Sequence, residues 1–411
     1  MRKLILIAAL TALLCSCNSP LPRGDWNKDV RKELNGLIRS EGSSSKKYDA
    51  ACPPYAVFDF DNTTIINDVE LCVTTYQIEF LRFKISPDQM PELLLRGVPD
   101  PDATLENISD HEVSARMLVE DICEDYSWLY SNYISLWISP TGEEARKALE
   151  KIDGRKEYRD FRAKLIALGN GIQSTFGYAE ACFWTENLFN GMTEGDIAGL
   201  VRDAADHNMA MKKVSSTTWE SPNRGKAGRI SVSFAQGMGL TDEMKSLYSA
   251  LKDNGFDVYI LSASRETVVE TLACDTAFGL DMAPENVYGL RFLTSQGGTV
   301  RFDSSYIQPY TEGKANAINA YIVPRHGGKD PALVAGDSNG DFAMLTSFPS
   351  LRIGLIVNCL RSGEISQLTR YALDGSTPEG FTPPSGVKYV VQGRDYCKKK
   401  FIRSSESIGL K

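Results

Sequence analysis

The sequence predicts an α/β fold: a Rossmann-like core, in which helices cover both faces of a parallel sheet, with a mostly helical domain inserted after the first strand. The run Tyr55–Phe58 is short and apolar, as expected for a buried strand. After residue 240, short apolar runs alternate with segments of helical periodicity, which is the pattern of parallel strands joined by crossover helices. We therefore expect a core domain of residues 18–66 and 236–398, interrupted by an inserted helical domain of residues 67–235.

Helical periodicity and turn residues predict the individual elements in order. The helices expected before residue 236 are 26–38, 69–83, 112–137, 142–167 and 193–213. The segment 215–236 contains a proline and several glycines, and we expect it to be irregular or extended. The strands expected in the second half are 257–262, 332–335 and 351–357, and the helices are 241–254, 265–278, 313–322 and 341–347. We also expect a small hairpin from 287–293 and 299–302, and a frayed tail past Lys398.

The N-terminus has the features of a lipoprotein signal peptide, residues 1–17. Two basic residues precede the apolar run Leu4–Leu14, which is too short to cross a bilayer comfortably but suits a secretory signal. Cys17 follows a small residue and resembles the lipid-accepting cysteine of a bacterial lipobox, and Asn18 at the next position favours the outer membrane. We therefore expect lipidation at Cys17 and a place in the bacterial cell envelope, on the outer membrane facing the periplasm. The alternative is an ordinary cleaved signal with an incidental cysteine.

The composition is that of a folded, acidic protein. Of 411 residues, 42% are hydrophobic and 24% charged, which suits a packed core. The formal net charge of −8 argues against a nucleic-acid partner, because such an interface needs a basic surface. The nine cysteines include no CxxC pair and the chain has three histidines, so no zinc site is expected. The pairing of the cysteines and the oligomeric state stay open.

An acidic stretch, Asp59-Phe60-Asp61-Asn62-Thr63, follows the first strand directly. In an extended chain, two residues separated by one point to the same side, so the two carboxyl groups of Asp59 and Asp61 can act on one substrate. One can attack phosphorus while the other transfers the protons that ester cleavage requires. The alternative is an Asp-rich turn that caps a helix.

Three later elements lie where strands end or helices begin. Ser262 closes a strand, although Ser264 is the more typical helix cap there. Lys314 lies at a helix start, where a phosphate partner would offset its conflict with the helix dipole; the alternative is a solvated surface lysine. Asp337 and Asp341 belong to Gly-Asp-Ser-Asn-Gly-Asp after a buried strand, and carboxylates so placed suit Mg²⁺, with a calcium-like turn as the alternative.

These four elements, in this order, resemble the motifs of the haloacid dehalogenase phosphatases: DxDx[TV], a strand-ending Ser or Thr, a Lys, and GDxxxD. The resemblance implies that Asp59 is the nucleophile and Asp61 the general acid and base. It also implies that Ser262 and Lys314 hold the phosphoryl group. The Mg²⁺ ligands implied in the same way are Asp59, Asp61 through its backbone carbonyl, Asp337 and Asp341.

The inserted domain corresponds to the C1 cap of that family, and it is far larger than the cap of the phosphoserine phosphatases. The sequence also departs from those enzymes at Gly340 and at Ala263-Ser264. Its motifs, its expected export and its large cap resemble the bacterial phosphorylcholine phosphatases. Recognition of choline calls for aromatic faces around the quaternary ammonium. The cap aromatics considered for that role are Trp128, Tyr130, Tyr133, Trp137, Trp184 and Trp219, and the alternative for each is core packing.

The resulting hypothesis is a Mg²⁺-dependent phosphomonoesterase that hydrolyses a small phosphate ester through an aspartyl-phosphate, with phosphorylcholine as a candidate substrate. One alternative is a phosphotransferase or a phosphonatase, which would need a Schiff-base lysine in the cap; the lysines available there include Lys147, Lys151, Lys156 and Lys164. Another is a non-catalytic, ligand-binding envelope lipoprotein. A basic loop with Arg224, Lys226 and Arg229 either leans over an anionic substrate or is a solvated turn.

Overall fold

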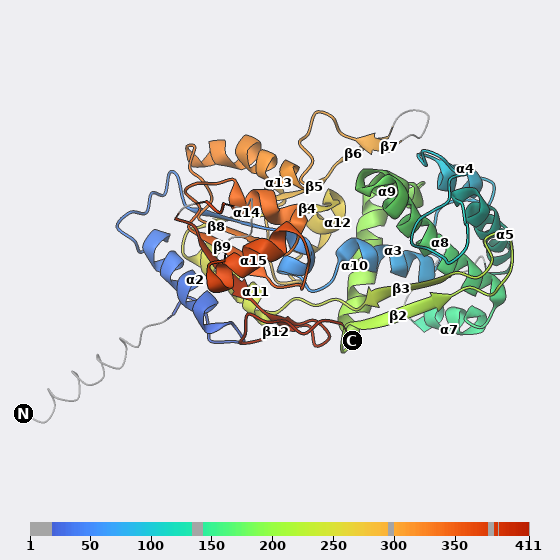
Figure 1. Cartoon of the computed structure of the whole chain (residues 1–411), viewed down its shortest axis with the longest axis horizontal. Coiled ribbons are helices and arrows are strands. Elements are labelled where there is room, and N and C mark those ends of the chain that lie inside the picture. Colours follow the sequence, from blue (N-terminus) through green and yellow to red (C-terminus); the bar gives the residue numbers. More distant parts are fainter. Residues whose placement is uncertain (1–18, 134–142, 295–299, 377–381, 385, 411) are drawn as a thin grey trace, which may run out of the picture.

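The computed structural model describes residues 19–133, 143–294, 300–376, 382–384 and 386–410. The expected signal peptide with Cys17, and the aromatic residue Trp137, lie outside the described residues. The chain forms two lobes joined near the middle of the molecule, with the sheet in one lobe and a bundle of helices in the other (Figure 1). We call these lobes the core and the cap.

The core is built on a six-stranded sheet in the order β10-β9-β8-β1-β4-β5, and all neighbouring strands are parallel. The strands are β1 (Tyr55–Phe58), β4 (Asp257–Arg265), β5 (Val287–Leu290), β8 (Leu333–Gly336), β9 (Ile353–Val357) and β10 (Lys388–Gln392). This confirms the predicted parallel α/β core. Because β1 lies between β8 and β4, the residues that follow these three strands emerge side by side at one edge of the sheet.

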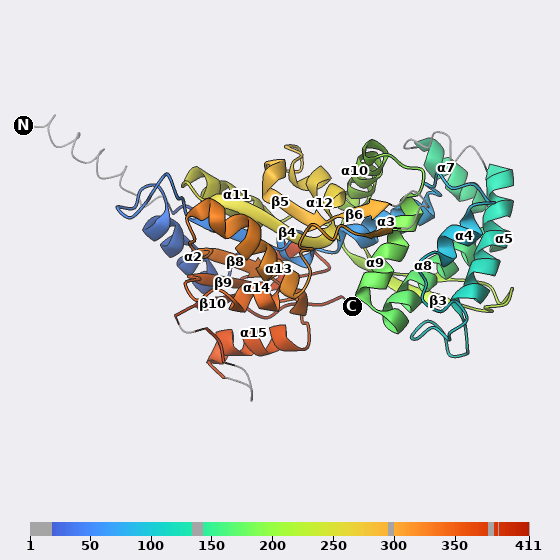
Figure 2. The same cartoon turned by 90° about the horizontal axis from the view of Figure 1, so that it is seen from above.

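Successive side chains of β1 enter different hydrophobic clusters, so both faces of the sheet are buried. Ala56 and Phe58 pack in the cluster with α2 (Lys28–Glu41), α11 (Asp242–Asp253) and α12 (Glu266–Ala273). Tyr55 and Val57 pack in the opposite cluster. The helices on that second face are α13 (Glu312–Ala317), α14 (Phe342–Thr346) and α15 (Glu364–Asp374). Figure 2 shows these two helical layers on either side of the strands.

The cap has a hydrophobic cluster of its own. Its helices are α4 (Met90–Leu95), α5 (Ala115–Tyr133), α7 (Glu143–Ile152), α8 (Lys156–Phe176) and α9 (Tyr178–Glu186), and its strands are β2 (Ser215–Glu220) and β3 (Ser231–Gln236). Two further helices, α3 (Val69–Glu79) and α10 (Glu194–Ala210), connect the lobes. Although α10 falls within the inserted segment, it packs on α3 and α12 and contributes to the core cluster.

Several cap elements differ from the sequence prediction. The single helix expected over 142–167 is two helices, because the chain turns at Asp153–Arg155 between α7 and α8. The segment expected to be irregular or extended is extended and forms the antiparallel hairpin β2–β3, whereas α4 and α9 were not predicted. Gly177 precedes α9, and its φ of 111° breaks the helical path after α8.

In the core, β4 continues through Arg265, three residues past the predicted end at Ser262. Ser264 therefore lies within a strand and Arg265 occupies the helix-cap position, which corrects the expectation that Ser264 caps the helix. The segment 287–290 is the edge strand β5 of the main sheet, and the hairpin pairs β6 (Phe292–Thr294) with β7 (Val300–Phe302) instead.

The prediction of a frayed tail past Lys398 is wrong. The chain forms β11 (Arg394–Asp395) and β12 (Lys400–Phe401), and Ile408 pairs with Asp395. Phe401 is 1% exposed, with its ring centroid 5.3 Å from that of Trp26. Apolar packing against the N-terminal helical segment therefore holds the end of the chain in place.

Among the described residues, no helix has the length and apolar character needed to cross a membrane. The seven cysteines in the same ranges are free thiols.

Candidate active site

The carboxyl ends of β1, β4 and β8 bring together all four elements that the sequence singled out. Asp59 follows β1, Ser262 lies near the end of β4 and Asp337 follows β8. Lys314, on the short helix α13, reaches the same place from the adjacent face. Ligands of open α/β sheets bind at this edge, where the strand order changes direction.

Lys314 is the centre of the charge arrangement. Its Nζ donates to Asp59 Oδ1 at 2.6 Å and to Asp341 Oδ1 at 2.6 Å, and all three side chains are buried. Burial alone would lower the pKa of Lys314, but Asp341 and Asp59 more than offset that effect and raise it. Lys314 is therefore a fixed cation beneath Asp59, not a solvated surface lysine.

Asp341 ties the loop after β8 together. Its Oδ2 accepts hydrogen bonds from the backbone N–H groups of Asp337 and Ser338, each at 3.0 Å, and from Ser338 Oγ at 3.1 Å. Gly336 is required here, because a Cβ at this position would lie 2.4 Å from Asp341 Cβ. Since the other oxygen of Asp341 pairs with Lys314, both oxygens have protein partners.

Asp59, Asp337 and Asp341 form a cluster fit for a divalent cation. Each offers a carboxylate oxygen, and these atoms all lie within 4.8 Å of one another. Burial and the neighbouring Asp341 raise the pKa of Asp59 and that of Asp337, although Lys314 opposes the effect on Asp59 and Arg361 opposes it on Asp337. Three buried carboxylates need more positive charge than one lysine supplies, and oxygen ligands of this kind suit Mg²⁺.

Asp61 is held by two different parts of the chain. Its Oδ1 accepts from the backbone N–H of Val69, the first residue of α3, at 2.6 Å. Its Oδ2 accepts from Ser264 Oγ at 2.7 Å and from Ser262 Oγ at 3.3 Å. Burial, followed by the charges of Asp68 and Asp59, raises the pKa of Asp61 well above its usual range. These surroundings favour a protonated carboxyl group, which is the form that a general acid needs.

The two serines near the end of β4, Ser262 and Ser264, have different positions. Ser262 is fully buried and its Oγ also accepts from the backbone N–H of Ser264 at 3.1 Å. Ser264, which the sequence suggested only as a helix cap, lines the cavity described below. It was missed because its role depends on β4 remaining extended past Ser262, and local sequence gives no signal for that.

A cavity of about 500 Å³ opens above these groups, between the core and the cap. The core supplies Asp59, Asp61, Lys314, Asp337 and neighbouring loop residues. The cap supplies residues of α3, α8 and α9. A volume of this size suits a small molecule.

Of the six cap aromatics named from the sequence, Trp184 lines this cavity. Its Nε1 donates to Leu94 O at 2.9 Å, and Gly169 on α8 makes room for the ring, since a Cβ there would lie 2.8 Å from it. Two aromatic residues that were not predicted, Tyr178 and Tyr310, also line the cavity, with ring centroids 5.9 Å apart.

The four other named aromatics that lie among the described residues pack away from the cavity, so the expected cage does not assemble from them. Trp128 stacks beneath Arg155 and contacts Tyr133. Tyr130 contacts Tyr126, and Trp219 packs edge-on against Phe234. These contacts correspond to core packing, the alternative considered for each residue.

The cap side of the cavity is acidic. Asp68, which caps α3 through the N–H of Leu71, and Glu70 both line it. Burial raises the pKa of both carboxyl groups, that of Glu70 to about 8. Sequence reasoning missed both residues because acids in the first turn of a helix are ordinarily explained by the helix dipole alone.

Core and cap are bound together beside the cavity. Arg265, the last residue of β4, pairs with Glu186 of α9 and with Glu194 of α10, the latter at 2.7 Å. Tyr178 Oη donates to Ala263 O at 2.6 Å. These contacts fix α9 over the end of β4.

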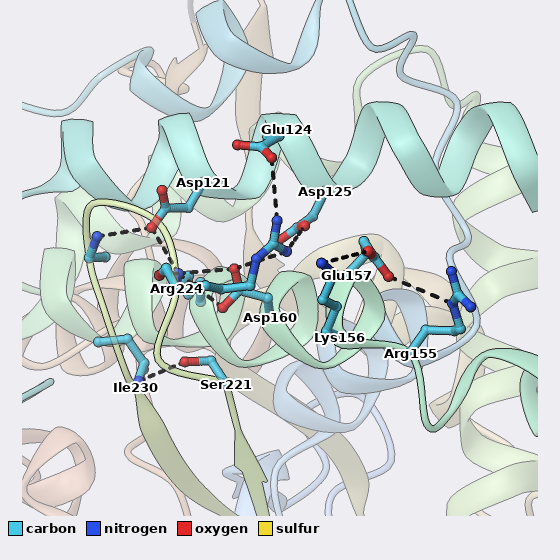
Figure 3. A network of polar contacts seen from close by, with 12 residues as sticks. Asp121, Glu124, Asp125, Arg155, Lys156, Glu157, Asp160, Ser221, Arg224 and Ile230 are labelled. Atoms are coloured by element: carbon cyan, nitrogen blue, oxygen red, sulfur yellow. Dashed lines mark hydrogen bonds and ion pairs between the residues drawn. The ribbon is translucent and has the colours of Figure 1, made fainter.

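The basic loop at the tip of the β2–β3 hairpin lies against α5 and α8, away from the cavity (Figure 3). Arg224 pairs with Glu124, Asp125 and Asp160 and does not lean over a substrate. The side chains of Lys226 and Arg229 are 63% and 64% exposed, in agreement with the alternative of a solvated turn. Lys226 pairs with Glu120, and Arg229 with Glu220 at 3.3 Å.

Of the cap lysines considered for Schiff-base chemistry, Lys164 is fully buried, 2.8 Å from Asp121 and 2.9 Å from Asp160. Lys147, Lys151 and Lys156 are exposed, and none of the four is among the described residues that line the cavity. The structure therefore gives the phosphonatase alternative no support.

Comparison with known proteins agrees with the motifs. The chain is 27% identical over 337 residues to a phosphorylcholine phosphatase of Pseudomonas aeruginosa, an alignment that covers 76% of this chain and 74% of the relative. It also superposes on a conserved protein of unknown function from Anaerococcus prevotii, with a TM-score of 0.82 and 29% identity over 95% of this chain and 99% of the other. No family model matches the chain.

Proposed function

We propose that this chain is a phosphatase of the haloacid dehalogenase type, and that it hydrolyses small phosphate monoesters through a phosphoryl group carried on Asp59, with Mg²⁺ as cofactor. The observation that carries the proposal is the position of Lys314, which lies 2.6 Å from both Asp59 and Asp341 at the floor of the cavity. The buried cation opposes the rise in the pKa of Asp59 that burial causes, and so favours the ionised form that can act as a nucleophile.

The reaction takes two steps. In the first, a carboxylate oxygen of Asp59 attacks phosphorus, the bond from phosphorus to the ester oxygen breaks, and Asp61 gives its proton to the departing oxygen. In the second, water attacks phosphorus, Asp61 takes a proton from that water, and the bond between phosphorus and Asp59 breaks to release inorganic phosphate. The raised pKa of Asp61 suits the first step, and loss of its proton prepares it for the second.

Asp59, Asp337 and the backbone carbonyl of Asp61 would hold the metal directly. Asp341, whose two oxygens already have protein partners, would act through a water molecule or through Lys314. When bound, Mg²⁺ supplies positive charge that offsets the charge on the phosphoryl oxygens.

We further propose phosphorylcholine as the substrate, because the relative from Pseudomonas carries that name and the cavity has features that suit a cation. Asp68 and Glu70 provide carboxyl groups, whose ionised form a bound cation would favour, and Trp184, Tyr178 and Tyr310 provide aromatic faces. This set replaces the cage expected from sequence, with Trp184 common to both.

For the N-terminus, we propose that Cys17 carries a lipid and holds the protein on the outer membrane, facing the periplasm. The lipobox-like sequence supports this proposal. Mass spectrometry of the mature N-terminus from a bacterial host would test it: a Cys17 that carries an S-diacylglyceryl group is expected, and a soluble form cleaved elsewhere would refute it.

Hydrolysis of p-nitrophenyl phosphate, with Mg²⁺ and with EDTA, tests the mechanism. We expect turnover that requires the metal and is lost in Asp59→Asn, whereas Asp88→Asn, at an exposed cap position, stays active. Rapid quenching followed by mass spectrometry should find one added phosphoryl group in the wild type during turnover and none in Asp59→Asn. Turnover that survives EDTA, or an active Asp59→Asn, would refute the mechanism.

A substrate panel tests specificity. Phosphorylcholine is expected to give a higher kcat/KM than phosphoserine and sugar phosphates, and Glu70→Gln should reduce this preference more than it reduces hydrolysis of p-nitrophenyl phosphate. Equal use of charged and neutral esters would remove choline from the proposal without affecting the core chemistry.

A further inference from the structure

The C-terminal segment Gly393–Leu410, which we call the C-terminal strap, crosses the junction between core and cap. In both views the C-terminus lies between the two lobes (Figures 1 and 2). On the cap side, Cys397 O accepts from Val214 N at 2.9 Å, and Lys399 Nζ donates to Met209 O at 3.0 Å. On the core side, Phe401 packs on Trp26. These contacts hold residues 397–401 of the strap against other parts of the chain.

Arg394 of the strap binds the turn that follows β1, residues 59–64, which we call the catalytic turn. Its Nη1 donates to Asn62 O at 2.9 Å and its Nη2 donates to Asn62 Oδ1 at 3.0 Å. The residue Arg394 is 4% exposed, and its guanidinium carbon lies 4.6 Å from the ring centroid of Tyr396. A buried arginine with two bonds to one residue fixes both the position and the orientation of that residue.

Asn62 lies in a strained part of the catalytic turn. Its φ of 61° places it in the left-handed region, directly after Asp61. Asn tolerates that conformation better than most residues, but it still needs support from its surroundings. The next residue, Thr63, donates to Asp337 Oδ1 at 3.3 Å, so the path of the chain at Asn62 sets how Asp61 and Thr63 approach the acidic cluster.

Tyr396 of the strap is hydrogen-bonded at the point where the chain passes between the lobes, near residues 67 and 235–237, which we call the cap hinge. Its Oη donates to Asn67 Oδ1 at 2.7 Å. Asn67 lies where the chain leaves the core for the cap, and its Nδ2 donates to Ala235 O at 3.2 Å and to Gly237 O at 2.8 Å, where the chain returns. Tyr396 therefore holds the residue that joins the outgoing and returning segments.

We propose that Arg394 and Tyr396 are positioning residues: Arg394 holds the catalytic turn through Asn62, and Tyr396 holds the cap hinge through Asn67. This inference rests on the proposed phosphatase mechanism. It places part of the active site's support in a segment more than three hundred residues from Asp59 and Asp61, at the end of the expected core domain.

The test for Arg394 compares Arg394→Ala, Arg394→Lys and Arg403→Ala, the last being an exposed arginine of the same strap. With p-nitrophenyl phosphate, kcat of Arg394→Ala should fall about 10- to 100-fold, since two charge-assisted bonds are lost. KM should change little, and Arg394→Lys should recover only part of kcat because lysine cannot make the forked contact. Arg403→Ala should match the wild type.

Chemical rescue separates positioning from a general loss of folding. Guanidinium at tens of millimolar should raise kcat of Arg394→Ala by refilling the buried site, and it should not raise that of the wild type or of Arg403→Ala. If kcat of Arg394→Ala stays within about threefold of the wild type, or if the loss equals the fraction of unfolded protein and guanidinium restores nothing, the inference on Arg394 is overturned. An inactive wild type would instead reject the proposed function.

For Tyr396, Tyr396→Phe removes only the hydroxyl group, and Tyr48→Phe is the matched control at the far side of the core, where the hydroxyl donates to Gly255 O. We expect Tyr396→Phe to raise KM about three- to tenfold for substrates that reach the cap, through the loss of one hydrogen bond, with a smaller change in kcat. Tyr48→Phe should leave both unchanged. A KM for Tyr396→Phe equal to that of the wild type would overturn the hinge role.

Discussion

Replacing Lys314 by Met removes the cation that bridges Asp59 and Asp341 and leaves their burial unchanged. Each contact is 2.6 Å long, and Coulomb's law at an effective dielectric constant of about 20 gives about 6 kcal/mol of attraction per contact. The cost of removing three charged groups from water offsets most of this attraction. Breaking a buried ion pair by removal of one partner typically costs about 3–5 kcal/mol, and we expect a loss of that size in the free energy of unfolding when no divalent cation is present.

Mg²⁺ should reduce this loss. The acidic cluster of Lys314→Met keeps Asp59, Asp337 and Asp341 but lacks the competing lysine, so it should bind a divalent cation more tightly than the wild-type cluster. A ligand present at about a hundred times its Kd adds about 2.7 kcal/mol of stability. Turnover should nevertheless be lost, because Lys314 is also expected to contact the phosphoryl group.

Urea unfolding in EDTA measures the loss of stability, and urea unfolding in Mg²⁺ measures how far the cation reduces that loss. Titration calorimetry measures the affinity for Mg²⁺, and hydrolysis of p-nitrophenyl phosphate measures turnover. Lys32→Met, at a side chain that is 75% exposed, is the control and should change neither stability nor turnover. If Lys314→Met loses the same stability with and without Mg²⁺, or binds Mg²⁺ more weakly than the wild type, the acidic cluster is not the metal site.

Three other predictions concern the cap. Burial, and then the neighbouring Asp160, raise the pKa of Asp125 to about 8, well above the ordinary value of 3.8. Its contribution to stability is therefore complete below about pH 4 and is lost as the pH rises through 8. Asp125→Asn, which carries an N–H in place of the proton, should reduce the fall in Tm between about pH 5 and pH 9, and an unchanged slope would contradict this. Arg265→Ala removes the ion pairs with Glu186 and Glu194, which join the two lobes. It should raise KM by about tenfold for esters that contact the cap, while Tm falls by only a few degrees. An unchanged KM would contradict a role of Arg265 in holding the cap on the core. Glu70→Gln should lower kcat/KM for phosphorylcholine by about tenfold relative to p-nitrophenyl phosphate, and an equal effect on both substrates would show that Glu70 does not recognise the cation.

The features that sequence could predict are those whose cause is local. Tyr55–Phe58 is apolar throughout because both of its faces are buried, and this pattern places Asp59 at the end of a strand. The loop after β8 combines a glycine that admits no side chain with two acids four residues apart. Once parallel strands are expected, the rule that ligands bind at their carboxyl ends brings these acids together without knowledge of the strand order.

The features that were missed depend on contacts between distant segments. Ser264 reaches Asp61 only because β4 pairs with β5 through a register shift before Arg265. Trp184 could not be distinguished from Trp219 by sequence, because both are buried cap aromatics and only the path of the chain directs one of them into the cavity. The end of the chain looks polar and exposed, yet Phe401 and Arg394 are buried by partners several hundred residues away.

The hydrogen bonds of Asp61 come from two different parts of the chain. Its Oδ2 is held by Ser264 of the core, but its Oδ1 is held by the backbone N–H of Val69, where the first helix of the cap begins. The bond from Val69 lowers the pKa of Asp61, whereas burial raises it, so a rotation of α3 away from the core would change this pKa in two opposing directions. Asp68 and Glu70, at the start of the same helix, line the cavity. In the proposed mechanism, one helix therefore positions both the general acid and the acidic groups that face the substrate.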